Sequence, residues 1–166
     1  MPPYRLQALL EIRTKAEDEA KEAFSHAVKA SEREKKKLAE LSVALERRIA
    51  ERKAKAQAFM EEMTRKGGGI TSFQQMQRFE SRLKDEEAQA ELEIEHQKDV
   101  LSEAEKVVEQ RRVEMAEAAM AKKAIEKHQD TWKKQVRFEQ QQREEMNQEE
   151  IGNALHLQRS RAEKKP

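Results

Sequence analysis

The sequence Lys66-Gly67-Gly68-Gly69-Ile70-Thr71-Ser72 decides the fold, because it holds three of the four glycines and separates two long helix-forming stretches. Gly67 follows a basic helix-forming segment and is expected to cap that helix in the left-handed conformation that glycine adopts easily. Ser72 and Gln75 have the spacing of a capping box, which predicts the start of a second helix. The segment therefore predicts a helix, a turn over residues 67–72 and another helix.

The composition excludes a globular core. Of the 166 residues, 40% are charged, 36% hydrophobic and 4% aromatic, which suits long helices that bury one face. Prolines stand only at positions 2, 3 and 166, so no interior proline interrupts a helix. We predict a single elongated all-α domain over residues 1–166, with helices over 4–66 and 73–151 and a frayed tail over 152–166, after a break at Gly152-Asn153.

Both arms carry apolar residues at helical spacing. The first runs from Leu6, Leu9 and Leu10 through an alanine-rich part to Leu38, Leu41, Leu45 and Met63, with a phase break expected near residues 31–37. The second keeps one alternation of three- and four-residue steps from Leu83 to Val136. Its polar interruptions are expected to select the register at some cost in stability. They are Glu87, Gln97, Arg111, Lys122 and Gln129.

The charges of the two arms favour pairing within one chain. Residues 4–66 hold 16 Lys and Arg against 12 Asp and Glu, a net +4, and residues 73–132 hold 10 against 15, a net −5. Folding at Gly68 places Tyr4 opposite Trp132 and Leu38 opposite Lys98. The predicted fold is a long antiparallel two-helix coiled-coil hairpin. Its second helix continues beyond the first, and Trp132 packs on Tyr4, Leu6 and Leu9 at the open end.

Catalytic and ligand-binding patterns are weak. The glycines of residues 67–69 lack the preceding strand and the Gly-Lys pair of a phosphate-binding loop. The four histidines have no metal-binding spacing, and a helical rod offers no enclosed pocket for acid-base catalysis. Trp132 stands among acidic neighbours, which is unfavourable for stacking on nucleic acid. We expect no enzyme, catalytic residue, metal or cofactor, and no nucleic-acid partner.

Hydropathy and charge indicate where such a chain acts. No window approaches the roughly 18 apolar residues of a membrane span, and the first residues lack the apolar run of a signal peptide. A net charge of +1 gives no general attraction to anionic lipid or nucleic acid, so a basic face would have to be local. We expect a cytoplasmic protein without direct membrane insertion.

The chain resembles the FliJ/YscO family of coiled-coil stalk proteins of the flagellar and virulence type III export apparatus. The opening Tyr4-Arg5-Leu6-Gln7-Ala8-Leu9-Leu10-Glu11-Ile12-Arg13 is similar to the family's aromatic-x-Leu-x-x-Leu-Leu-x-x-Arg pattern. Gly69-Ile70-Thr71-Ser72, followed by Met76, Phe79 and Leu83, looks like its turn and second-helix start. The glutamine-rich, acidic residues 142–150 are similar to the family's charged C-terminal stretch, although Ile151-Gly152-Asn153 departs from it.

The resemblance implies a non-enzymatic central stalk that binds and stimulates the hexameric export ATPase. It also implies contacts with the export-gate membrane protein and secretion chaperones, at the periphery of the inner-membrane export apparatus. The flagellar and virulence branches both stay open. The expected partner-binding residues lie at the open end of the hairpin and on the overhanging second helix. They are Tyr4, Leu6, Leu10, Arg13, Arg137, Phe138, Arg143, Met146, Glu149 and Glu150.

Two other classes fit part of the pattern. A prefoldin-like chaperone subunit has two helical arms, but it needs β-hairpins between them, and residues 67–72 are too few to form one. A generic structural or scaffolding coiled coil, such as a dimeric one, explains the composition equally well. Its mass in solution would separate it from a monomeric hairpin.

Overall fold

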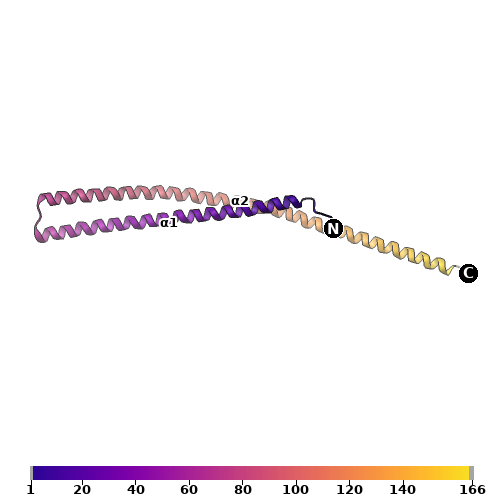
Figure 1. Cartoon of the computed structure of the whole chain (residues 1–166). Coiled ribbons are helices and arrows are strands. Elements are labelled where there is room, and N and C mark those ends of the chain that lie inside the picture. The colour runs from indigo at the N-terminus through magenta and orange to yellow at the C-terminus, as the bar shows by residue number, and fades with distance from the viewer. Residues whose placement is uncertain (1, 165–166) are drawn as a thin grey trace. The chain divides into compact units, whose positions relative to one another are not determined.

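The structure is a computed structural model that describes residues 2–164. It consists of two α-helices, α1 (Gln7–Lys66) and α2 (Ile70–Glu163), joined by a short turn (Figure 1). The helices pack against each other as an antiparallel hairpin, which confirms the predicted fold class. The chain divides into two compact units, each described by itself below: Met1–Ala20 with Met115–Pro166, and Lys21–Glu114.

The turn confirms the predicted helix cap at Gly67. Gly67 has a φ of +67°, and its N–H donates to the carbonyl of Met63 at 3.0 Å, so it caps α1 in the left-handed conformation. The predicted start of the second helix at a Ser72 cap was wrong, because α2 begins at Ile70 and Ser72 lies inside it. The N–H of Phe73 donates to the carbonyl of Gly69 at 3.3 Å, so the backbone is helical before a Ser72 cap could form.

Both helices differ from the predicted bounds at their outer ends. α1 begins at Gln7 instead of Tyr4, because residues 4–7 form a turn in which the Gln7 N–H donates to the Tyr4 carbonyl at 3.1 Å. α2 passes through Gly152 without a break and ends at Glu163. One glycine costs about 1 kcal/mol in a helix, which neighbouring turns can absorb because elongation is cooperative. The predicted frayed tail is therefore helical to Glu163, and Lys165 and Pro166 lie outside the described residues.

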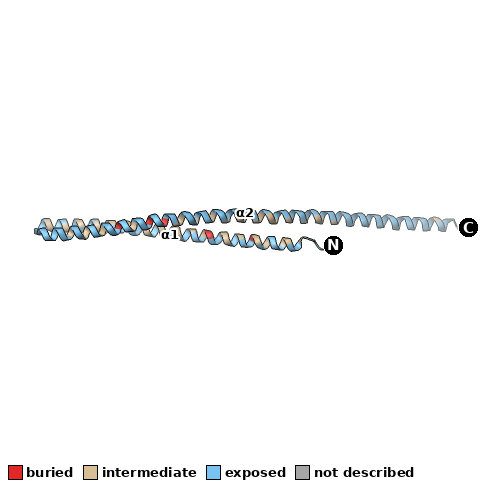
Figure 2. Ribbon diagram, turned by 90° about the horizontal axis from the view of Figure 1, so that it is seen from above, coloured by how far each residue is buried: buried red, intermediate tan, exposed pale blue. Residues whose placement is uncertain are grey.

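The face of α2 that follows the predicted alternation is buried or half-buried at every step from Leu83 to Val136 (Figure 2). The polar interruptions lie on this face as expected. In α1, however, the predicted break near residues 31–37 was wrong. Ser31 and Glu34 continue the half-buried face from Ala27 to Leu38, and the alternation shifts instead around Ile49. A polar residue can hold a seam position when the facing helix supplies its hydrogen bond, as Gln97 does for Glu34.

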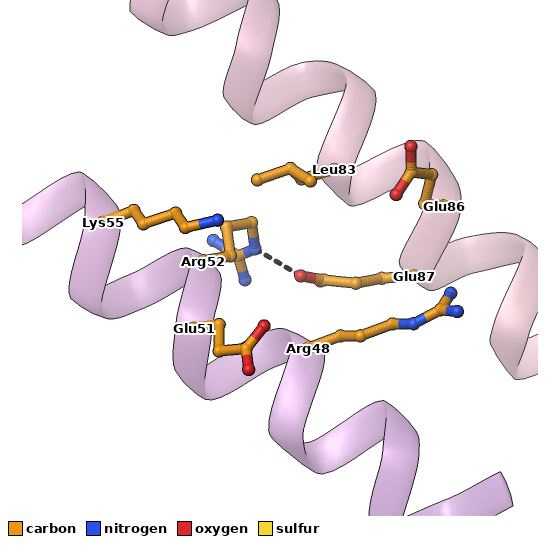
Figure 3. A pocket seen from close by; sticks show the side chains of 7 residues that line it. All are labelled: Arg48, Glu51, Arg52, Lys55, Leu83, Glu86 and Glu87. Atoms are coloured by element: carbon orange, nitrogen blue, oxygen red, sulfur yellow. Dashed lines mark hydrogen bonds and ion pairs between the residues drawn. The ribbon is translucent and has the colours of Figure 1, made fainter.

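Polar pairs link the two helices within the unit Lys21–Glu114. The Arg52 Nε donates to Glu87 Oε1 at 2.6 Å (Figure 3). Arg52 Nη1 also lies 3.4 Å from Glu80 Oε1. The Glu87 hydrogen bond raises the pKa of Arg52. Gln97 is 4% exposed and donates to both the carbonyl and the carboxylate of Glu34. Because leaving such groups unpaired is costly, these contacts favour one register of the hairpin.

The other unit has cross-helix polar pairs of the same kind. Lys122 Nζ lies 2.9 Å from a Glu17 carboxylate oxygen, and this contact raises the pKa of Lys122. Gln129 Nε2 donates to Gln7 Oε1 at 3.2 Å. Three of the polar positions expected to select the register, Glu87, Gln97 and Lys122, are thus paired with α1 through charged groups. Gln129 is paired through neutral amides.

Candidate partner-binding site

The open end of the hairpin is held by an aromatic cluster of Tyr4, His128 and Trp132. The Tyr4 and Trp132 rings lie 5.1 Å apart between centroids at a tilt of 46°, which confirms that Trp132 packs on Tyr4. The Tyr4 hydroxyl hydrogen-bonds His128 Nδ1 at 2.7 Å, and Tyr4 is only 9% exposed. From the sequence alone, His128 was not distinguished from the other three histidines. Its position four residues before Trp132, on the same helix face, was the available signal.

A hollow of about 520 Å³ lies beside this cluster. One wall comes from residues 2–6 and the other from α2, where Trp132 and Val136 provide apolar surface and Gln135 and Glu139 a polar edge. Residues 2–6, which precede α1, therefore form part of the open end. They cover the Trp132 ring and create a concave surface at the place where the overhang begins.

The overhang is the part of α2 over residues 137–163, and residues 137–159 are all exposed. Phe138 and Met146 are 60% and 61% exposed, so the overhang offers apolar side chains to solvent. Hydrogen bonds along the helix support it, including Gln141 Nε2 to Glu145 Oε1 at 3.0 Å. The overhang is thus a single helix that presents charge of both signs and five large apolar groups, namely Phe138, Met146, Ile151, Leu155 and Leu157.

The ten residues expected to bind partners fall into two groups. Tyr4 is buried and Leu6 and Leu10 are half-buried, so these side chains hold the open end together, while Arg13 is exposed. The structure brings Tyr4 and Leu6 to the same hollow. The other six are all exposed on the overhang. They are Arg137, Phe138, Arg143, Met146, Glu149 and Glu150.

The remaining hollows offer little chemistry. The hollow in Figure 3 has a volume of about 240 Å³, and its lining contains three basic and three acidic side chains. It is lined by Arg48, Glu51, Arg52, Lys55, Leu83, Glu86 and Glu87. On the exposed surface, Arg112 donates to Glu109 at 2.9 and 2.6 Å and lowers the pKa of Glu109. Within residues 2–164, no group of three or more His, Cys, Asp or Glu could hold a metal ion. Nor does any helix of that range have the length and apolarity to cross a membrane.

Comparisons with known proteins agree with this geometry. The sequence matches the YscO-like protein family over residues 1–162. A solved structure described as a YscO homolog from Chlamydia trachomatis has a TM-score of 0.79 at 22% identity, and the match covers 97% of this chain and 99% of that chain. No curated protein matches the sequence. The structural likeness establishes a shared fold, and the family match over nearly the whole length establishes that this chain belongs to the YscO-like family.

Proposed function

We propose that this chain is the non-enzymatic central stalk of a type III protein export apparatus, where it binds and stimulates the hexameric export ATPase. In the same role it links that ATPase to the export-gate membrane protein and to secretion chaperones, on the cytoplasmic side of the inner membrane. Membership in the YscO-like family supports a type III secretion protein of the stalk type.

The overhang carries this proposal. It extends α2 past the aromatic cluster as an exposed helix, so a ring can surround it without displacing a packed partner. Arg137 and Arg143 can pair with acidic groups of the ring interior, and Glu149 and Glu150 with basic ones. Charge of both signs favours orientation and encounter rate more than raw affinity, so the binding is expected to be weak and sensitive to salt.

Phe138 and Met146 are the apolar anchors of the proposed contact, because large apolar groups that leave water on binding contribute most of the affinity at an interface. Tyr4, Leu6 and Leu10 act indirectly, by fixing the base from which the overhang projects. A single asymmetric helix cannot match six equivalent sites at once. The mismatch lets the stalk rebind or turn within the ring.

Two truncations test the contact against a matched control. A chain ending at residue 136 lacks the whole overhang, while a chain ending at residue 151 keeps all six proposed contact residues. ATP hydrolysis by the partner ATPase is measured at low salt with the intact chain and with each truncation. We expect the intact chain and the longer truncation to stimulate it equally and the shorter one to stimulate it several-fold less. Equal stimulation by all three chains would exclude the overhang as the ATPase contact. No stimulation by the intact chain would contradict the proposed function.

A further inference from the structure

The closed end of the hairpin, residues 59–79, concentrates the large flexible and aromatic apolar residues of the chain. Three of the five phenylalanines and three of the seven methionines lie there. Met60 is 54% exposed, Ile70 78% and Phe73 42%. Packing between α1 and α2 therefore leaves much of this apolar surface in contact with water, at the point where the chain reverses (Figure 1).

The closed end alone, residues 59–79, holds three Lys and Arg against two Glu, a net +1, and becomes basic when the flanking helical turns on both sides are included. Residues 53–84 hold seven Lys and Arg against three Glu, a net +4, compared with +1 for all 166 residues. Of those acids, Glu62 lies 3.3 Å from Lys66, and Glu80 lies 3.4 Å from Arg52 and 3.5 Å from Lys84. The basic groups also adjoin the apolar ones, since the Arg82 guanidinium lies 5.2 Å from the Phe79 ring centre.

The shape of the closed end favours a lipid interface over a helix of a protein partner. Its hollows measure about 190 and 120 Å³, below the several hundred Å³ of a typical ligand pocket. The apex consists of three glycines followed directly by Ile70, which is 78% exposed, while Met60 and Phe73 line only the hollow of about 120 Å³. A helix of a protein partner needs a groove to bury its apolar face, whereas a lipid interface deforms around a projecting tip.

The geometry points to an anionic lipid surface as the partner of the closed end. Ile70, Phe73 and Met60 enter the headgroup region, and the surrounding Lys and Arg side chains, Arg65 and Arg78 among them, lie near lipid phosphates. This contact is interfacial and needs no membrane-spanning helix. The Lys and Arg residues within 53–84 form a local basic face, which the net charge of +1 for the whole chain does not reveal. The lipid contact uses none of the residues of the proposed ATPase contact and does not rest on it.

Flotation with lipid vesicles tests the inference. The full chain is mixed with vesicles of phosphatidylcholine alone or with about one-third phosphatidylglycerol. One variant combines Ile70→Ser with Phe73→Ser. The matched control combines Val43→Ser with Leu92→Ser, which are 58% and 63% exposed on the same unit but away from the turn. We expect the original chain and the control to float with the anionic vesicles, and the tip variant to bind at least tenfold less.

A dye provides a second readout, because the chain has no cysteine. A polarity-sensitive fluorophore on Thr71→Cys should shift to the blue with anionic vesicles, and the same fluorophore on Ser102→Cys should not. Removing residues 137–166 should leave both results unchanged, which separates this inference from the proposed function. Absence of vesicle binding, equal binding to both vesicle types, or undiminished binding by the tip variant would overturn it. Binding of an acidic amphipathic peptide in place of vesicles would overturn it in favour of a protein partner.

Discussion

Replacing Tyr4 should release the open end of the hairpin, because this one side chain joins the start of α1 to both His128 and Trp132. Its hydrogen bond to His128 Nδ1, at 2.7 Å, contributes about 0.5–1.5 kcal/mol. The tilted contact with Trp132 at 5.1 Å adds about 0.5–1.5 kcal/mol beyond the burial of the ring. With about 1.5–3 kcal/mol for burying a large apolar side chain, Tyr4→Ala should cost about 2.5–6 kcal/mol locally.

Amide hydrogen exchange in the first turns of α1 measures this local cost, because about 1.4 kcal/mol corresponds to a tenfold change in an equilibrium. The Leu10 N–H, which donates to the Leu6 carbonyl at 2.9 Å, is a suitable probe. Tyr4→Ala should accelerate its exchange about a hundredfold or abolish its protection, and Tyr4→Phe about fivefold. Arg5→Ala changes an exposed neighbour and should have little effect.

Fluorescence gives an independent check, because Trp132 is the only tryptophan. Its emission should move to longer wavelength in Tyr4→Ala as the ring becomes exposed to water. The reasoning would be refuted if the original protein already emitted like a fully exposed tryptophan. It would also be refuted if Tyr4→Ala and Arg5→Ala gave the same exchange rate at Leu10.

Three further predictions concern the unit Lys21–Glu114. Gly67→Ala should destabilise the hairpin by about 1–2 kcal/mol in thermal unfolding, because φ is +67°, whereas Gly69→Ala, with open space for a Cβ, should cost less. Cysteines at Leu38 and Gln97, the latter beside the predicted facing residue, should form a disulfide within one chain, and exclusively intermolecular bridges on a non-reducing gel would contradict the hairpin. The lowered pKa of Glu109 means that its ion pair stabilises the helix above the ordinary carboxyl pKa and is lost as pH falls through the lowered value. An NMR titration of the Glu109 carboxylate should therefore show a midpoint below 4.5, its ordinary value, and a midpoint at or above it would contradict the pairing.

Much of the candidate site was predictable because it depends on residues that are close in sequence. The seam alternation of α2 reaches Val136 and then gives way to polar residues, so the sequence alone indicated an overhang. Which side chains at the open end stay exposed was not predictable. Tyr4 was expected both to pack on Trp132 and to bind a partner; it packs on Trp132, and its hydrogen bond to His128, 124 positions away, was not foreseen. The hollow beside Trp132 also depends on how residues 2–6 pack against α2.

By itself, the sequence determined the hairpin, since the Gly67 stop and the helical periodicity of both arms are local properties of contiguous residues. The tertiary structure decided which polar groups pair, such as Arg52 with Glu87 across 35 residues, because a long charged side chain can reach several positions on the facing helix. It also decided where helices end. Gly152 and Ser72 are stop and start signals whose free energies of about 1 kcal/mol are small compared with those of the surrounding helical turns and cross-helix contacts.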